Sequence, residues 1–278
     1  MAATLTNDSG LTAGESGGWI ETLARVGYAA KGFVYLIIGA LALQLAFSSG
    51  GDAVGPKGAV SSLAGEPFGR ILIALTAAGL FCYSAWRFVQ AAKDPEGKGS
   101  DAKGIAARVG YTCSAIAYAT VGIEAVRILM SGGGGQGGGA SHWTAKLMEM
   151  PMGRWLVAIA SLAMLGAGGY QFYRGYSAKF QKLLKSEEMS SEEITWGERL
   201  GRVGFMARGV VYFIIGSFLV VAAYQTDPQQ AKGVGGALEY LTTTGWGPWV
   251  LGIIAAGLFA YGAFSVLILA RYRRILGS

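Results

Sequence analysis

The sequence has few of the residues that build most active sites. Its 278 residues include a single histidine, His142, and only two cysteines, Cys82 and Cys113, which both fall within long apolar runs. One histidine per chain excludes bis-histidine haem sites, histidine-rich metal sites and the zinc-protease helix motif. It also leaves hydroxyl side chains in the apolar runs without a histidine base. We therefore expect no catalytic residue, no metal, no cofactor and no enzymatic activity.

Charge is scarce as well. Only 14% of the residues are charged and 52% are apolar, and the mean hydropathy is +0.41. A soluble domain of this length could not cover its surface with so few charges. All six prolines fall in connections or at helix starts, so proline interrupts none of the apolar runs. The composition therefore predicts an integral membrane protein with unbroken spans.

Six apolar runs are long enough to cross a bilayer. At a rise of about 1.5 Å per residue, helices of this length span the roughly 30 Å hydrocarbon layer. Strands would have to close into a barrel, and these runs lack the alternating polar face of a barrel. We accordingly expect an all-α polytopic membrane protein with six transmembrane helices. The predicted spans are Val26–Phe47, Ile71–Ala92, Val109–Met130, Trp155–Tyr173, Val203–Tyr224 and Trp249–Ala270.

The basic residues predict how the chain is oriented. Of the 23 lysines and arginines, 17 belong to the N-terminal region, the second-to-third and fourth-to-fifth connections and the C-terminus, and 5 belong to the opposite side. Basic residues gather on the cytoplasmic side of membrane proteins, so we expect both termini in the cytoplasm. The net charge of +6 then indicates contact with anionic lipid. No basic soluble face points to nucleic acid as a partner.

A phrase of arginine, valine, glycine and an aromatic residue occurs three times, beginning at Arg25, Arg108 and Arg202. Each copy opens an apolar run and continues in register to a tyrosine and a glycine, and the following run repeats as well, most clearly between 77–86 and 255–264. The unit is therefore a helical pair present three times. Because each pair crosses the membrane twice, all three enter from the same side, and a pseudo-threefold axis along the membrane normal can relate them.

The repeats divide the chain into four parts. A disordered polar N-terminus is expected at 1–18, followed by repeats at 19–97, 98–186 and 187–278. The second repeat contains a glycine-rich external linker at 131–141. At its end, in the segment 175–186, apolar residues alternate with Lys179, Lys182 and Lys185. That pattern is typical of an interfacial helix that dips into anionic headgroups.

The residues shared by the first helix of each unit lie three and four positions apart and form one stripe of small and aromatic side chains. Small residues let helices approach closely in lipid, so we expect the stripe to face protein and to serve packing. A ligand-lined stripe is the alternative. Its members are Tyr28, Gly32, Tyr35, Gly39, Tyr111, Tyr118, Gly122, Phe205, Gly209, Tyr212 and Gly216.

Basic residues near the helix entrances suggest a binding site. Arg25, Arg108 and Arg202 could converge at the cytoplasmic mouth, joined by Lys31 and Arg208 two turns deeper. Such a cluster would bind an anion or a lipid phosphate. We favour the other interpretation, ordinary placement at a helix entrance, where the side chains of arginines reach the interface.

One acidic residue, Glu124, lies well inside a predicted span, which makes it a candidate functional residue. Arg127 lies three residues further along the same helix face. We expect the two to form an ion pair near the outer interface, and the alternative is an ion or proton site.

The threefold helical pair, with its opening phrase and its later tyrosine and glycine, resembles a bacterial family of integral membrane proteins known only as a domain of unknown function in triplicate. The resemblance covers roughly Trp19 to Arg274. It implies six spans in a bacterial inner membrane, and it brings no catalytic or ligand residues to this chain.

Two functions fit these observations. The first is a non-enzymatic accessory or structural subunit that packs against other integral membrane proteins or specific anionic lipids. Small-residue stripes, unbroken helices and sparse intramembrane charge favour it slightly. The alternative is a small transporter or channel for an ion or anionic solute along the pseudo-threefold axis, where the three arginines and Glu124 would act.

Overall fold

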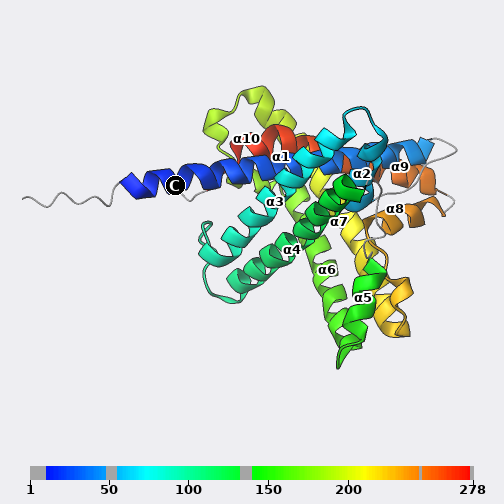
Figure 1. Ribbon diagram of the computed structural model, residues 1–278. Helices are drawn as coiled ribbons and strands as arrows, with labels where there is room; N and C mark the ends of the chain where they lie inside the picture. The colour runs from blue at the N-terminus through cyan, green and yellow to red at the C-terminus, as the bar shows by residue number, and fades with distance from the viewer. Residues whose placement is uncertain (1–10, 48–54, 132–139, 244–245, 276–278) are drawn as a thin grey trace, which may run out of the picture.

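Six long helices dominate the computed structural model, which describes residues 11–47, 55–131, 140–243 and 246–275 (Figure 1). Each of the six is long and apolar enough to cross a membrane, so the predicted spans are confirmed. None of the described residues forms a strand of a sheet. The long helices are α1 (Leu11–Phe47), α3 (Gly69–Lys93), α4 (Ala102–Ser131), α6 (Gly153–Tyr176), α7 (Ser191–Gln225) and α9 (Gly247–Phe264), which continues through a π-helical turn, η5 (Ser265–Leu269), into α10 (Ala270–Tyr272).

Each repeat also contains a short helix that was not predicted, placed just before its second long helix. The second long helix of each repeat begins with a glycine. The carbonyl oxygen of a leucine six residues earlier lies so close to this glycine that a Cβ would collide with it. The three glycines are Gly69, Gly153 and Gly247. These equivalent turns fix a register: a residue of α3 corresponds to the residue 84 positions later in α6 and 178 positions later in α9. The short elements are α2 (Pro56–Ser62), α5 (Ala140–Met148) and α8 (Val234–Thr242), with 3-10 turns η1 (Leu63–Gly65), η2 (Lys179–Leu183), η3 (Ser186–Glu188) and η4 (Pro228–Gln230).

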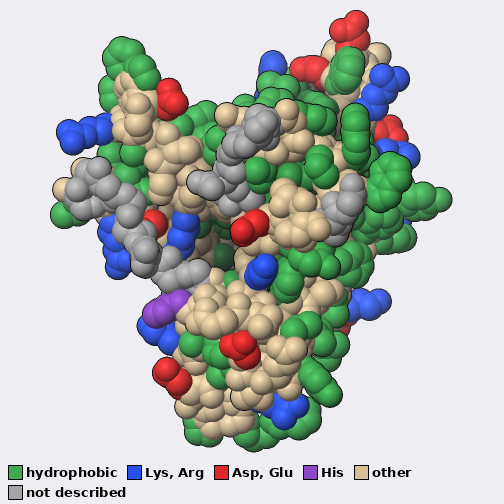
Figure 2. Space-filling model, turned by 90° about the vertical axis from the view of Figure 1, so that its right-hand side faces the viewer, with side chains coloured by type: hydrophobic (Ala, Val, Ile, Leu, Met, Phe, Trp, Pro, Cys, Tyr) green, Lys and Arg blue, Asp and Glu red, His purple; other side chains and the backbone are tan. Residues whose placement is uncertain are grey.

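The long helices pack side by side in the order of the repeats. α1 packs against α3, α3 against α4, α6 against α7, α7 against α9, and α9 back against α1. In the described part of the chain, α4 and α6, the two long helices of the second repeat, make no comparable contact. The ring of helices is therefore open between α4 and α6. Figure 2 looks onto the side where α8 lies, and this face is hollowed near its middle.

Glycines hold the first and third hairpins closed. A Cβ on Gly27 of α1 would lie 2.5 Å from the Cα atom of Tyr83 on α3. In the third repeat, a Cβ on Gly204 of α7 would lie 2.6 Å from the Cα atom of Tyr261 on α9. Small residues bring membrane helices together in this way, because they let the two backbones approach closely.

The second hairpin lacks these contacts. Gly110 of α4 is the equivalent of the two glycines just described, but no atom of another helix would lie within 4 Å of its Cβ. Trp86 on α3 and Phe264 on α9 are fully buried, whereas their equivalent on α6, Tyr170, is 63% exposed. The first and third repeats therefore share a packing that the second does not. The threefold rotation inferred from the repeats stays a prediction.

Residues 175–186 do not form the interfacial helix that their sequence suggested. After α6 ends, the chain continues as short 3-10 turns that hydrogen-bond to the C-terminal segment. Phe180 and Leu184 are buried, and the ring of Phe180 lies 5.2 Å from the rings of both Phe205 and Phe264. Phe180 and Leu184 thus pack into the protein, although Tyr176 is exposed, and the predicted amphipathic helix was wrong.

Two further expectations concern the N-terminal segment and the glycine-rich linker. Of the N-terminus expected to be disordered, residues 1–10 lie outside the described residues, but residues 11–18 belong to α1. Most of the glycine-rich linker, residues 132–139, also lies outside the described residues.

Candidate functional site

Lys31 is buried among tyrosines inside the helix bundle. Only 3% of its surface is exposed. Its Nζ atom donates hydrogen bonds to the hydroxyl oxygens of Tyr83 on α3, at 3.0 Å, and Tyr261 on α9, at 2.8 Å. The same nitrogen lies 4.9 and 5.1 Å from the centroids of these two rings. Because α1 packs against both α3 and α9, the lysine side chain is enclosed from two sides.

Arg208 of α7 lies against the same tyrosine. Its guanidinium carbon is 4.3 Å from the ring centroid of Tyr261 and 5.2 Å from that of Tyr35, and its Nη2 atom donates a hydrogen bond to the Tyr212 hydroxyl at 2.5 Å. Arg208 is only 7% exposed. Its Nε atom is buried and has no hydrogen-bond partner among the described residues. This arginine is therefore surrounded by aromatic rings, with part of its hydrogen-bonding capacity unused.

The repeats bring these residues together. Lys31 and Arg208 each follow the opening arginine of their repeat by six residues. The later tyrosines of the repeats lie close together: the Tyr118 ring is 4.8 Å from that of Tyr83, and the Tyr35 ring is 5.0 Å from that of Tyr261. We call this group the cation–tyrosine cluster; it consists of Lys31, Arg208, Tyr35, Tyr83, Tyr118, Tyr212 and Tyr261.

The cluster has positive charge that its surroundings do not neutralise. None of the ion pairs between described residues includes Lys31 or Arg208. Arginine is not deprotonated in proteins, so Arg208 keeps its charge. Burying such a charge without a counter-charge costs several kcal/mol, by order of magnitude. A deprotonated tyrosine of the cluster or a bound anion would compensate it, and the arrangement can therefore hold an anion.

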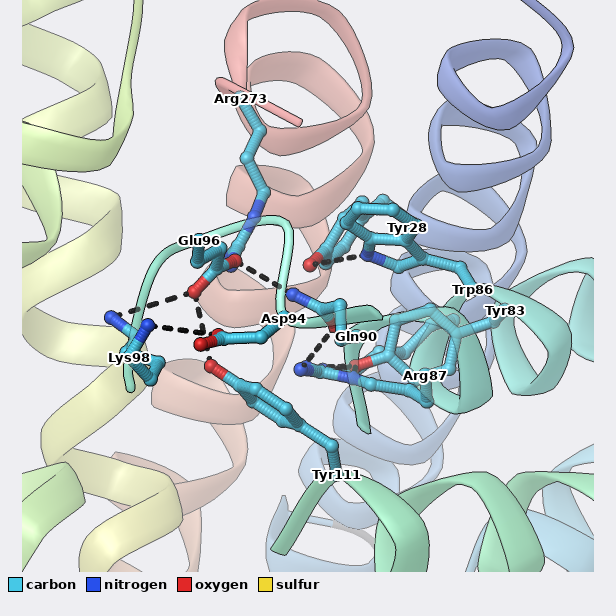
Figure 3. A network of polar contacts seen from close by, with 11 residues as sticks. Tyr28, Tyr83, Trp86, Arg87, Gln90, Asp94, Glu96, Lys98, Tyr111 and Arg273 are labelled. Atoms are coloured by element: carbon cyan, nitrogen blue, oxygen red, sulfur yellow. Dashed lines mark hydrogen bonds and ion pairs between the residues drawn. The ribbon is translucent and has the colours of Figure 1, made fainter. Parts of the chain in front are cut away.

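A chain of polar contacts leads from the cluster to the loop between α3 and α4 (Figure 3). Arg87 donates from Nε to the Tyr83 hydroxyl at 2.8 Å and from Nη1 to Oε1 of Gln90 at 2.9 Å. Gln90, which is fully buried, donates from Nε2 to Oε1 of Glu96 at 2.6 Å. Glu96 also accepts a hydrogen bond from Nη2 of Arg273 at 2.7 Å. The chain thus connects the buried lysine to charged groups at the end of the bundle where α10 ends (Figure 1).

Glu96 neutralises Arg273 and is not available to the cluster. Burial by itself raises the pKa of Glu96, but the charge and hydrogen bond of Arg273 outweigh burial and, with Lys98 and Tyr111, lower the pKa to about 2. The Tyr111 hydroxyl donates to Oε2 of Glu96 at 3.0 Å, and Nζ of Lys98 lies 3.5 Å from the same oxygen. The carboxylate is therefore ionised at neutral pH and fully engaged.

The three opening arginines do not converge, so the hypothesis that they form one cluster at the cytoplasmic mouth is wrong. Arg25 donates from Nη1 to the backbone carbonyl oxygens of Ala270 and Arg271 in α10. Arg108 donates from Nε to a carbonyl oxygen at the end of α3, at 2.6 Å. Arg202 pairs with Glu198 on its own helix at 2.7 Å. Arg25 and Arg108 each cap the last carbonyls of a different neighbouring helix, which is a favourable use of a cation and holds them apart.

The other predicted charged residues also lie outside the cluster. Lys179 and Lys182 are exposed, and Lys185 forms a surface ion pair. Glu124 is buried on α4 and forms an ion pair with Arg127, as the spacing predicts, with 3.6 Å between Oε2 and Nη1.

The stripe residues have two uses in the structure. All eleven are buried or half-buried. Its glycines lie where helices of different repeats cross: a Cβ on Gly32 would lie 2.8 Å from the carbonyl oxygen of Gly262, and one on Gly209 would lie 2.9 Å from that of Gly168. Its three later tyrosines belong to the cation–tyrosine cluster. The stripe thus serves packing at its glycines, and its later tyrosines contribute to the cation–tyrosine cluster.

Six residues of the cluster and its polar chain had no predicted role: Tyr83, Tyr261, Arg87, Gln90, Glu96 and Arg273. The repeat of the second helix aligns Tyr83 with Tyr261, and this was the available signal for a shared role. Arg87 was counted only as a charge at the cytoplasmic side, while Gln90 and Glu96 carry no repeat pattern. Among the described residues, no three His, Cys, Asp or Glu side chains are grouped so that they could hold a metal ion.

The repeats match a known protein family. Residues 26–94, 109–178 and 203–273 each match the family described as Domain of Unknown Function (DUF1206). The chain is also similar to the uncharacterized protein YxxB of Bacillus subtilis (strain 168), with 32% identity over 249 residues that cover 90% of each chain. No solved structure matches the chain. The threefold unit, and the resemblance to a bacterial membrane protein family, are confirmed.

Proposed function

The chain belongs to the DUF1206 family, and we propose that it binds a small anionic solute at the cation–tyrosine cluster and carries it across a membrane. It is a multi-pass membrane protein with six membrane-spanning helices. The observation that supports the proposal most directly is the burial of Arg208 without any carboxylate partner among the described residues. An ionised side chain inside a membrane span usually marks the path of a substrate or ion.

The geometry favours an anion over a cation as the solute. Two basic side chains from equivalent repeat positions meet at Tyr261, with 2.8 Å between Lys31 Nζ and the tyrosine hydroxyl and 4.3 Å between the arginine carbon and the ring centroid. Repulsion between the two cations disfavours a third positive charge and favours a negative one. The unused Nε–H of Arg208 offers a charge-assisted hydrogen bond to such an anion.

Several features complete the proposal. The protein is not an enzyme, it lies in the bacterial inner membrane with both termini in the cytoplasm, and its basic side contacts anionic lipid. The 17 basic residues predicted on one side support this orientation. Arg25 and Arg108, which cap neighbouring helices, then stabilise the bundle at the cytoplasmic surface.

The accessory role remains a second candidate, because α6 presents a broad apolar face. Trp155, Ile159, Leu162 and Tyr170 are each more than half exposed on this helix. Lipid or a helix of a partner membrane protein can cover such a face. A native pull-down from detergent extracts that yields a stoichiometric membrane partner, together with vesicles that carry no flux, would support this role over transport.

Anion uptake into vesicles tests the transport function. The purified protein is reconstituted in phosphatidylcholine vesicles, and uptake of labelled acetate and efflux of chloride are measured for the wild type and for Arg208→Gln. Loss of one charge-assisted hydrogen bond costs about 1.5–3 kcal/mol, so we expect the variant to lose roughly tenfold or more of the flux. Arg199→Gln is the matched control, because Arg199 lies exposed on the same helix.

Three outcomes decide the matter. Flux that falls in Arg208→Gln and stays within about twofold of the wild type in Arg199→Gln supports the proposal. Absence of anion flux in the wild type, with or without added phosphatidylglycerol, refutes transport. Flux that requires phosphatidylglycerol and is unchanged in Arg208→Gln assigns the anion site to lipid headgroups at the surface and refutes the role of the cluster.

A further inference from the structure

We propose that α4 and α6 are a moving pair of helices, which open to admit the anion to the cation–tyrosine cluster and close behind it. The identity of the ligand rests on the proposed function, while the movement follows from the packing. Among the described helices, α1 packs against α3 and α7 against α9, but the corresponding helices of the second repeat stand apart.

The faces of α4 and α6 that stand apart include the positions at which the two helices of the other repeats touch. In the first repeat, Ala30 of α1 faces Gly79 of α3 so closely that a Cβ on the glycine would collide with it, and the same alanine–glycine contact joins α7 to α9 in the third. The equivalent residues of the second repeat are Cys113 and Ala163, which are both exposed. A groove of about 360 Å³ lies on this face of α4, lined by Ile105, Arg108, Val109, Thr112 and Cys113.

The opening lies beside the cation–tyrosine cluster. On one side, Tyr118 of α4 lies 4.8 Å from the ring of Tyr83. On the other side, α6 packs on α7 at Gly209, the residue after Arg208, where a Cβ would lie 2.9 Å from the α6 backbone. The cluster tyrosines on α4 and α7, Tyr118 and Tyr212, are half-buried, whereas the other three are buried. The least covered side of the cluster therefore faces the place where α4 and α6 separate.

At two positions of the cluster, the second repeat has a small residue where the first and third repeats have a large one. Ala167 of α6 stands at the position of Tyr83 and Tyr261, and Ser114 of α4 stands at the position of the two cations. Both small residues are half-buried. The difference between tyrosine and alanine is one phenol group, so closure of α6 onto α4 would leave room for a ligand of about that size. We assign the site to an anion no larger than benzoate.

A disulfide across the opening tests the movement. Ala163→Cys is introduced with Cys82→Ser, so that the new thiol can bond only to the native Cys113. The bond requires the Cβ atoms to come within about 4.5 Å, which corresponds to a closed hairpin. We expect oxidant to form this bond in vesicles, acetate and benzoate flux to fall roughly tenfold or more, and reductant to restore both. Formation of no cross-link, although both thiols react with a maleimide, would overturn the movement.

A second variant tests the ligand position. Ala167→Tyr gives the second repeat the residue that the other repeats have, so we expect acetate and benzoate flux to fall roughly tenfold or more. Ile159→Tyr is the matched control on the outer face of α6, where the native side chain is 64% exposed. Equal flux in both variants would overturn the position assigned to the ligand.

The results also separate this inference from the proposed function. If Arg208→Gln abolishes flux while the cross-link forms and leaves flux unchanged, the transport function stands and the moving pair is wrong. If the cross-link forms reversibly but the wild type carries no anion, the movement of α4 and α6 stands and the proposed anion transport is wrong.

Discussion

The ion pair between Glu96 and Arg273 offers a quantitative test of the structure, because it joins the α3–α4 loop to the end of the chain. The two side chains are 10% and 6% exposed, and 2.7 Å separates the bonded atoms. A folded-state pKa of about 2, against an ordinary value of 4.5, corresponds to roughly 3 kcal/mol of stabilisation at neutral pH. Glu96→Gln keeps the shape of the side chain and removes this charge, so we expect a loss of about that size.

The pH dependence has a definite sign. The folded-state pKa of Glu96 lies below its ordinary value, so its contribution is complete above about pH 5 and is lost as the pH falls towards 2. The wild-type thermal midpoint in detergent should therefore fall over this range, and the midpoint of Glu96→Gln should start lower and fall less. A cost of roughly 3 kcal/mol corresponds to a shift of about 6 °C or more. The exposed Glu66→Gln should leave the midpoint unchanged, and a Glu96→Gln variant with wild-type midpoint and pH slope would refute the reasoning.

Two further predictions concern stability. Gly27→Ala should lower the thermal midpoint markedly, because its Cβ would lie 2.5 Å from the Tyr83 backbone. Gly110→Ala should leave the midpoint nearly unchanged, since its Cβ meets nothing within 4 Å. A fall in the midpoint of Gly110→Ala as large as that of Gly27→Ala would show that the second hairpin is closed. Phe180→Ala should cost about 3–5 kcal/mol as a buried aromatic, whereas the 73% exposed Tyr176 should tolerate alanine; a neutral Phe180→Ala would restore the interfacial-helix interpretation.

The six spans could be predicted because hydropathy and length are local properties of the chain. Each predicted span lies within a helical segment of the structure, which extends beyond the span by 3 residues in α3 (25 against 22) and by 15 residues in α1 (37 against 22). The short helices α2, α5 and α8 were missed, since helices of 7 to 9 residues lack a long periodic pattern. The segment around Phe180 was misread for a different reason: an amphipathic pattern fits a lipid surface and a protein surface equally well.

The candidate site was predicted only in part. Lys31 and Arg208 were recognised as deeper cations, but they were grouped with Arg25, Arg108 and Arg202. A helical stripe gives the face on which a residue lies, and it does not give the residue that it meets. Arg25 and Arg108 cap neighbouring helices and Arg202 pairs with a glutamate on its own helix, whereas the two deeper cations meet tyrosines of other helices. These partners are far apart in the sequence, so the contacts depend on how the helices pack.

The amino-acid sequence by itself determined the number and approximate positions of the membrane spans, the threefold repeat of a helical pair and the scarcity of reactive groups, because each of these is written in consecutive residues. Only the tertiary structure decided that Lys31 and Arg208 meet at Tyr261 and that α4 stands apart from α6. Both depend on contacts between helices remote in the chain, where the close approach of a glycine or the burial of one ring decides which faces meet.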